Sequence, residues 1–337
     1  MPVKTVVSPL EDAYSFFRLD RQSVPVSPAT LRTYDFHVQP FLRWLKTNHP
    51  GVSAVGDVDV NHLRAYRAEL VQRPGLMGRT MQPESMAGID TSIRTFFRWA
   101  LDEGYEVQPR ILTLRRVRVP WKEPTIFHLK QLREVIAACN EELPHEALAV
   151  KLLVGAGLRR AELGGLALRA PDGLSDLMLD SIDRGIAELR VRGDGGAKGM
   201  KTRRVPITTR LALEMKRYAA RLRPRSDDPH LLLNRNGQHY GDLGINELMV
   251  RLSARVGYRI HAHAFRHTFA TVATQLGWNF ERLRSAMGHA DYATLQRYVR
   301  LSMERDLGRL EDWLEFVALP PQPQIVPFGH LSRRRVT

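Results

Sequence analysis

A basic stretch bounded by prolines divides this sequence into two parts with different patterns. Residues 110–124 carry four arginines and one lysine, and they contain Pro120 and Pro124. A residue that precedes proline is disfavoured in the helical region, so this stretch is predicted to be an extended linker. The flanking parts hold roughly 100 and 200 residues, each enough for a core of its own. The chain of 337 residues is therefore expected to form two domains.

The first part shows helical spacing. Ser27 before Pro28 is typical of a helix N-terminus, and apolar residues recur at helical intervals as far as Leu45. Two further helices are predicted at 60–70 and 84–102. The first part is therefore expected to be a small helical domain.

The second part alternates between helical and strand-like segments. Only residues 186–191 and 203–207 are strand-like, and a glycine-rich hairpin lies between them. We therefore expect a fold that is mainly α with a small antiparallel β-sheet. The helices predicted here are 125–139, 144–154, 159–168, 210–222, 242–256, 264–276, 279–287, 293–300 and 303–319.

Apolar residues at helical spacing continue beyond residue 300. Leu307, Leu310, Trp313, Leu314 and Val317 form one stripe, which predicts a C-terminal helix that packs against an apolar surface. The expected organisation is an N-terminal extension (1–26), a helical domain (27–102), a basic linker (103–126), a second domain (127–300), the C-terminal helix (301–319) and a flexible tail (320–337).

The charge balance favours a polyanionic partner. The chain has 50 Lys and Arg against 36 Asp and Glu, a formal net charge of +14. Such a balance suits the DNA or RNA backbone, although a basic protein without a nucleic-acid role would look the same. Any single basic residue can also be an ordinary solvated side chain. The candidates for backbone contact are Arg64, Arg67, Arg79, Arg94, Arg98, Arg115, Arg116, Arg118, Lys122, Lys201 and Arg203.

The sequence also indicates a compartment. Cys139 is the only cysteine, so no internal disulfide can form. No apolar run follows Met1, and the longest apolar stretch, residues 147–154, is interrupted by Lys151. We therefore expect no membrane contact and a cytoplasmic protein, associated with the nucleoid if the host is a bacterium.

Residues that suit chemistry on a phosphodiester gather near the end of the second part. Three histidines and an arginine lie within residues 261–271, Gly288 and His289 follow, and Tyr298 lies nine residues after His289. Arginine offers planar donors that match phosphate oxygens. A tyrosine hydroxyl can act as a nucleophile, and histidine can hold or move its proton. This combination requires no metal.

The histidines of this region also raise the alternative of a zinc site. His263 and His267 are four residues apart on a predicted helix, and His261 lies close by. However, Arg266 would repel a cation, and no cysteine or carboxylate completes a ligand set. We therefore expect neither a metal nor a cofactor, and we expect His267 to be packed or partnered locally.

Four segments resemble the sequence boxes of the tyrosine recombinases, also called the lambda-integrase family. Residues 157–163 resemble the first arginine box, and residues 197–207 resemble the hairpin lysine segment. Residues 263–271 resemble the second box, and 288–298 resemble the third. The resemblance covers roughly residues 125–300, and four boxes in the family's order are not expected by chance.

The resemblance implies an active site at six positions. Tyr298 would be the nucleophile, Lys198 the general acid, and His263 the base for the tyrosine or a phosphate contact. The remaining positions would stabilise charge on the phosphate in the transition state. The six positions are Arg159, Lys198, His263, Arg266, His289 and Tyr298.

Two of these assignments have competitors. Arg160 stands next to Arg159, although the family pattern selects the first arginine after Gly-Leu. The hairpin is longer than the family's usual one, so Lys201 competes with Lys198. Glu162 is expected to be structural and to brace Arg159 or the fold.

By resemblance, the chain is expected to be a site-specific DNA recombinase of integrase, resolvase or transposase type, acting through a 3′-phosphotyrosine. Its expected partners are double-stranded DNA clamped between the two domains, further copies in a tetramer on two DNA sites, and accessory DNA-bending or directionality proteins. The C-terminal helix would dock on a neighbouring copy in that tetramer, with packing on its own domain as the alternative. A type IB topoisomerase-like enzyme and a non-catalytic DNA-binding protein on the same fold are the alternatives.

Overall fold

The chain folds into two compact units, and the first gives way to the second along the sequence between Glu123 and Pro124. The computed structural model describes residues 9–24, 26–73, 80–178, 187–193, 202–288, 292–305 and 307–318. Within these residues, none of the helices is both long enough and apolar enough to cross a bilayer.

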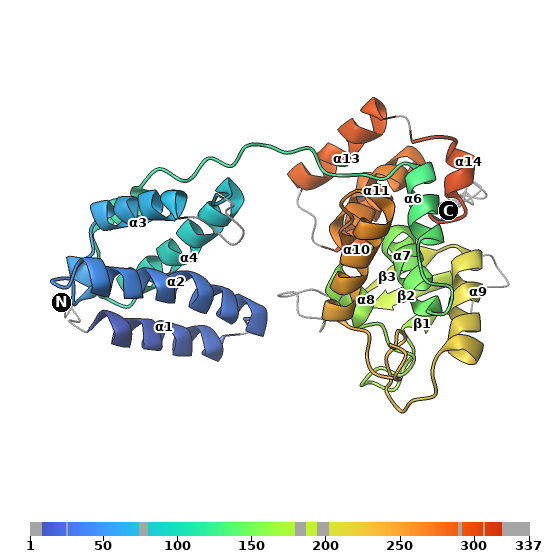
Figure 1. Cartoon of the computed structure of the whole chain (residues 1–337), viewed down its shortest axis with the longest axis horizontal. Helices are drawn as coiled ribbons and strands as arrows, with labels where there is room; N and C mark the ends of the chain where they lie inside the picture. The colour runs from blue at the N-terminus through green and yellow to red at the C-terminus, as the bar shows by residue number, and fades with distance from the viewer. Residues whose placement is uncertain are drawn as a thin grey trace, which may run out of the picture. The chain divides into compact units, whose positions relative to one another are not determined.

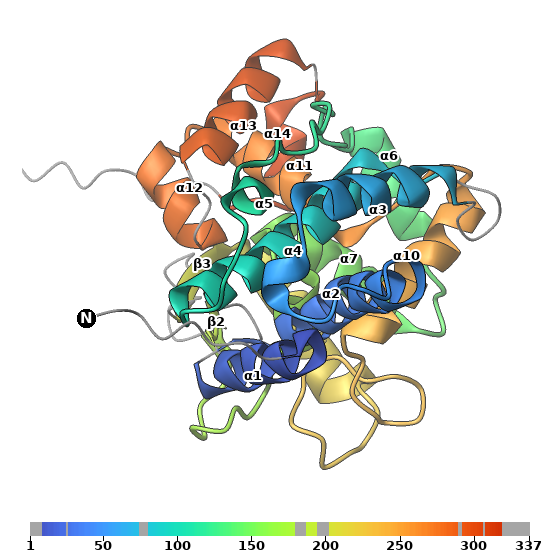
Figure 2. The same ribbon diagram turned by 90° about the vertical axis from the view of Figure 1, so that its left-hand side faces the viewer.

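The first unit is a helical domain with an aromatic core. Figures 1 and 2 show α1 alongside α2, and α2 also packs against α4. The predicted N-terminus of α2 is confirmed, because the Ser27 hydroxyl accepts a hydrogen bond from the Thr30 amide at 3.1 Å. The helices are α1 (Leu10–Ser23), α2 (Pro28–Asn48), α3 (Val60–Gln72), α4 (Pro83–Asp102) and α5 (Pro109–Thr113).

The expectation of an extension before residue 27 was wrong for residues 10–23. These residues form α1, which buries Leu10, Tyr14 and Phe17 in the core of the first unit. The Tyr14 hydroxyl donates to Asp35 on α2 at 3.0 Å. The apolar residues of α1 lie at helical spacing, so the pattern was present in the sequence.

The expected linker also begins later than predicted. Tyr105, Val107 and Ile111 are buried in the first core, and α5 occupies part of the stretch expected to be extended. The non-helical segment that connects the units therefore begins after Thr113.

Two arginines that were candidates for DNA contact instead bind the backbone near the start of this segment. Asp90 on α4 is 3% exposed and accepts hydrogen bonds from both Arg67 and Arg94. Arg94 also donates to the Leu112 carbonyl at 2.8 Å, and Arg67 donates to the Arg115 carbonyl at 3.1 Å. We therefore assign Arg67 and Arg94 to the fold and not to the DNA contact.

The other candidates of the first unit fall into two groups. Arg79 lies outside the described residues. The remaining side chains are exposed, and Lys122 forms an ion pair with Glu84 at 2.7 Å. The exposed candidates are Arg64, Arg98, Arg115, Arg116, Arg118 and Lys122.

The second unit combines helices with one small sheet, as the sequence predicts (Figure 1). The strands are antiparallel in the order β1-β2-β3, and Leu189 of β2 pairs with Val205 of β3. The elements are α6 (Leu129–Ala137), α7 (Pro144–Ala156), α8 (Arg160–Gly164), β1 (Leu177–Met178), β2 (Ala187–Val191), β3 (Arg203–Ile207), α9 (Thr209–Arg217), α10 (Asp242–Val256), α11 (Ala262–Gln275), α12 (Phe280–Met287), α13 (Tyr292–Glu304) and α14 (Leu310–Trp313).

The core of this unit surrounds α7 and α11. Both helices are buried around most of their circumference, which explains why α7 has so few polar residues. Phe265 and Phe269 of α11 are fully buried, and Thr268 on the same helix accepts from the Phe127 amide at 2.8 Å. This bond fastens the beginning of the second unit to α11.

The predicted continuous helix at 301–319 was wrong. The helix α13 ends at Glu304, and α14 is a single turn at Leu310–Trp313. Trp313 and Val317 are nevertheless fully buried in the core of the second unit. In the single chain this C-terminal segment therefore packs on its own domain. The expected tail, from residue 320 onwards, lies outside the described residues.

Candidate active site

The first arginine of the candidate site follows a tight turn between α7 and α8. Gly157 ends α7 in the left-handed conformation, with φ of 60°, and a Cβ there would overlap the Phe269 ring. Arg159 then occupies the N-cap position of α8. The turn therefore fixes where the Arg159 backbone lies relative to α11.

Glu162 joins this turn to the second arginine. Its carboxylate accepts from the Arg159 amide at 2.8 Å and from the Arg159 guanidinium at 2.7 Å. The Arg266 guanidinium on α11 lies 3.9 Å from the same carboxylate and donates to the Gly157 carbonyl at 2.6 Å. The two arginines expected to bind phosphate are therefore positioned around one buried acid.

Arg203 completes the set of arginines around Glu162. Its guanidinium donates to both carboxylate oxygens, at 3.0 and 2.8 Å, and its side chain is only 7% exposed. A buried side chain with these contacts is not available to a nucleic-acid backbone. We therefore correct the assignment of Arg203 from DNA contact to brace of Glu162.

Burial and the neighbouring charges shift the pKa values of Glu162 and Arg266. Burial opposes ionisation of Glu162, but hydrogen bonds and attraction from Arg203 and Arg159 outweigh it and lower the pKa of Glu162 to about 2. Burial and the neighbouring Arg159 lower the pKa of Arg266 to about 10, while Glu162 and Tyr298 favour its charged form. Both groups are therefore ionised at neutral pH.

The same three arginines fix the end of α12. Arg203 donates to the Ala286 carbonyl at 2.7 Å, Arg266 donates to the Met287 carbonyl, and Arg159 donates to the Gly288 carbonyl at 2.8 Å. The last carbonyls of a helix have no partner within the helix and carry partial negative charge. The three cations therefore position the chain immediately before His289, which itself lies outside the described residues.

The competing arginine of the first box faces another element. Arg160 binds Asp242 at 2.6 Å and Asn246 at 2.7 Å, both on α10. Its side chain is 40% exposed. This geometry supports Arg159 as the active-site candidate, because Arg159 shares Glu162 with Arg266.

The three histidines of α11 have different surroundings. His261 caps the helix, and its Nδ1 accepts from the Ala264 amide at 3.2 Å. His263 is exposed, and burial of part of its ring together with the nearby Arg266 lowers its pKa. Its ring meets the His267 ring edge-on at 4.3 Å. Among the described residues, no group of three or more His, Cys, Asp and Glu could hold a metal.

His267, expected to be packed or partnered locally, contacts the His263 ring four residues away and also Tyr298, 31 positions away. His267 Nδ1 lies 2.8 Å from the Tyr298 hydroxyl oxygen, and Tyr298 is 2% exposed. The contact joins α11 to α13. It was not predictable from spacing, because it depends on how these two helices pack.

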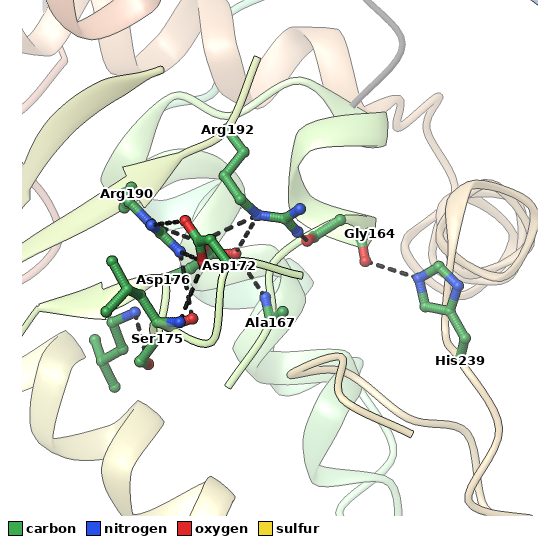
Figure 3. Close-up of polar contacts among 11 residues, drawn as sticks. Gly164, Ala167, Asp172, Ser175, Asp176, Arg190, Arg192 and His239 are labelled. Carbon is green, nitrogen blue, oxygen red and sulfur yellow. Dashed lines mark hydrogen bonds and ion pairs between the residues drawn. The ribbon is translucent and has the colours of Figure 1, made fainter. Parts of the chain in front are cut away.

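A second buried acid holds the strand that leads into the lysine hairpin. Figure 3 shows Arg190 and Arg192 of this strand region converging on Asp176, at 3.1 and 3.0 Å. Arg192 also donates to the Gly165 carbonyl next to α8. The end of β2 is therefore tied to the element that carries Arg159. The competing lysines of the hairpin, Lys198 and Lys201, lie outside the described residues.

The described part of the site can bind an anion and hold a nucleophile. The Arg159 side chain remains 31% exposed, and His263 on α11 is exposed as well. Burial of part of the His263 ring is the main cause of its lowered pKa, and the charge of Arg159 contributes. Fixed cationic donors of this kind stabilise charge that develops on a phosphate. The Tyr298 hydroxyl lies 2.8 Å from His267 Nδ1, on the same helix as Arg266, and a tyrosine hydroxyl can act as a nucleophile.

The comparison with known families decides between the candidate chemistries. The model of the phage integrase family matches residues 126–305, which is more than half of the chain. The chain belongs to the phage integrase family. It is therefore a tyrosine recombinase, an enzyme that cleaves and rejoins DNA.

Relatives of this tyrosine recombinase span nearly its whole length. Tyrosine recombinase XerC of Pelobacter propionicus is 27% identical over 327 residues, covering 94% of this chain and all of that protein. Tyrosine recombinase XerA of Thermococcus kodakarensis is 27% identical over 283 residues, covering 82% of this chain and 86% of that protein.

Solved structures show the same two-domain fold. The integrase of the Tn1549 transposon, in complex with transposon right end DNA, is 17% identical, with a TM-score of 0.64 and coverage of 88% of this chain and 99% of that one. A lambda integrase dimer bound to a core site is 13% identical, with a TM-score of 0.65 and coverage of 90% and 99%.

Proposed function

We propose that this tyrosine recombinase performs site-specific recombination through a 3′-phosphotyrosine on Tyr298. The observation that carries the proposal is that Arg159 and Arg266 both lie against the Glu162 carboxylate, while His267, on the same helix as Arg266, binds the Tyr298 hydroxyl. Two cations beside a tyrosine hydroxyl suit attack on a phosphodiester.

In the proposed reaction, the Tyr298 oxygen attacks phosphorus and the bond to the 5′ oxygen breaks. Arg159, Arg266 and His289 stabilise the charge on the non-bridging oxygens, and a histidine of the site takes the Tyr298 proton. By resemblance, His263 either has that role or contacts the phosphate. Lys198 gives the leaving 5′ oxygen its proton. The phosphotyrosine conserves the energy of the broken bond, so rejoining needs no nucleotide and the proposed mechanism uses no metal.

The same proposal extends to partners. Both units would contact double-stranded DNA, the first through its exposed basic side chains. Tn1549 integrase and lambda integrase were solved with DNA, the latter as a dimer, which supports self-association on DNA. We further propose a tetramer on two sites, with accessory DNA-bending or directionality proteins, acting in the cytoplasm at the nucleoid.

A neighbouring copy in that tetramer could receive the C-terminal segment. In the single chain, Trp313 is fully buried and Trp278 donates to the Ala318 carbonyl at 3.1 Å. Docking in trans would therefore require the segment to leave its own domain and to make equivalent contacts on the neighbour.

A covalent-capture experiment tests the function. The purified protein is incubated with fragmented host DNA, denatured in detergent and freed of non-covalent DNA, and the attached DNA is sequenced. A single enriched site, absent with Tyr298→Phe, is expected. A plasmid with two copies of that site should then give recombinants, whereas relaxation of a one-site plasmid without recombinants would indicate a type IB topoisomerase.

A further inference from the structure

The hydroxyl of the proposed nucleophile has a specific partner in this structure. His267 Nδ1 on α11 lies 2.8 Å from the Tyr298 oxygen on α13, and the rings lie 5.6 Å apart at an angle of 47°. A neutral imidazole with its proton on Nε2 presents a lone pair at Nδ1, so it can accept the hydrogen bond from the phenol. His267 therefore touches a reacting atom.

The contact between His267 and Tyr298 lies close to residues that are proposed to bind the phosphate. Residues 263, 266 and 267 are three and four apart, so they share one face of α11. Tyr298 is close enough to Arg266 to favour its charged form. The hydrogen bond thus holds the Tyr298 oxygen beside the groups that would receive the phosphate.

The neighbouring histidine is placed differently. His263 is exposed, and its ring contacts the His267 ring and not the tyrosine ring in the contacts of the described residues. His263 is therefore placed to contact the phosphate of a DNA strand that binds from solvent. His267 is placed to accept a hydrogen bond from the hydroxyl of the buried Tyr298 side chain.

We propose that His267, and not His263, accepts the proton of Tyr298 during cleavage, an inference that rests on the proposed function. The Tyr298 O–H bond breaks, its proton moves to the Nδ1 lone pair, and the oxygen forms a bond to phosphorus. The 5′ oxygen leaves with its electron pair and takes a proton from Lys198. On rejoining, the His267 imidazolium returns the proton to Tyr298 as the phosphorus–tyrosine bond breaks.

The first test measures cleavage of a nicked suicide substrate that carries the captured site. Glutamine accepts a hydrogen bond but cannot take the proton at neutral pH. His267→Gln and His267→Ala should therefore both lose cleavage, by ~100-fold or more, the size expected for removal of a general base. Cleavage by His267→Gln at the wild-type rate would overturn the proposal, because the hydrogen bond alone would then suffice.

The second test removes Tyr298 from the chemistry. A strand ending in a 3′-(4-nitrophenyl) phosphate is joined to a strand with a free 5′ hydroxyl. The 5′ oxygen attacks phosphorus and loses its proton to neutral Lys198, while 4-nitrophenolate leaves without needing a proton. The comparison is made in Tyr298→Phe, where only the 5′ oxygen can attack. Adding His267→Ala or His267→Gln to Tyr298→Phe should leave the joining rate unchanged, because no tyrosine proton remains to be accepted.

The two tests together separate the possible roles. Equal losses in cleavage and in nitrophenyl joining would overturn the proposal, because His267 would then support the fold or the phosphate. Faster cleavage by His267→Ala would also overturn it, because His267 would then only restrain the tyrosine. Covalent adducts formed by Tyr298→Phe would instead refute the proposed function, independently of His267.

His263→Ala is the matched control. It lies on the same face of α11 and is proposed to contact the phosphate in both reactions. It should therefore slow cleavage and nitrophenyl joining alike. Normal nitrophenyl joining with slow cleavage in His263→Ala would assign the proton acceptor to His263 and overturn the proposal.

Discussion

Arg203 of β3 donates to both carboxylate oxygens of Glu162 on α8, and both side chains are buried. Arg159 and Arg266 lie around the same carboxylate. Glu162 therefore links β3, the strand that follows the lysine hairpin in the sequence, to both arginines that are proposed to bind phosphate. Its removal would leave three cations close together without compensation.

The first prediction concerns Glu162 and stability. Glu162→Gln should destabilise the second unit by about 3 kcal/mol, the size expected when one partner of a buried ion pair is removed. Urea unfolding of both proteins at pH 7 measures this difference. An equal stability of the two proteins would show that the arginines are accommodated without the acid.

The pKa of Glu162 gives this difference a pH dependence. Because folding lowers the pKa from 4.5 to about 2, ionised Glu162 stabilises the fold fully above about pH 4.5. The stabilisation is lost as the pH falls from about 4.5 through about 2. The advantage of the wild type over Glu162→Gln should shrink across that window, and a constant advantage would contradict the assignment.

The second prediction separates Arg203 from its neighbour on the strand. Arg203→Lys loses the paired contact with Glu162, so cleavage should fall by ~10-fold or more while DNA affinity stays close to that of the wild type. Arg204 is 65% exposed at its side chain and serves as the control. Arg204→Lys should leave cleavage unchanged. A loss of DNA affinity in Arg203→Lys without loss of cleavage would restore the DNA-contact assignment.

The third prediction distinguishes basic residues that bind DNA from those that hold the linker. Arg116→Ala with Arg118→Ala should weaken DNA binding and reduce the slope of affinity against salt by about 2, one for each phosphate contact. Arg94→Ala removes its bonds to Asp90 and Leu112, so it should destabilise the first unit instead. An unchanged salt slope in the double variant would exclude these two contacts.

The fourth prediction identifies the general acid. Lys198→Ala should slow cleavage severely, whereas Lys201→Ala should slow it much less. A bridging 5′-phosphorothiolate has a leaving group that needs no proton, so it should restore the cleavage rate of Lys198→Ala. Rescue of Lys201→Ala instead would move the role to Lys201.

Local signals in the sequence predicted much of the fold. The cap at Ser27 and the apolar spacing of 242–256 define helices that the structure contains with the same starts. Other signals were present but were not used. Arg203 shares the inward face of β3 with Val205 and Ile207 by strand alternation, which indicated its burial.

The parts of the site that the sequence could not predict depend on tertiary packing. The four boxes proposed the site residues, but they did not indicate that Glu162 forms ion pairs with three arginines. Nor did they indicate that the carbonyls at the end of α12 accept hydrogen bonds from those arginines. The contact of His267 with Tyr298 likewise depends on how α11 lies against α13. Spacing along one helix contains no information on such pairs.

The most direct test of the central claim is the identity of the residue that carries DNA after cleavage. The covalent adduct is digested with nuclease and protease, and the modified peptide is sequenced by mass spectrometry. We predict a 3′-phosphate linked to Tyr298 and no adduct with Tyr298→Phe. A nucleotide attached to another residue, or attached through a 5′-phosphate, would contradict the account.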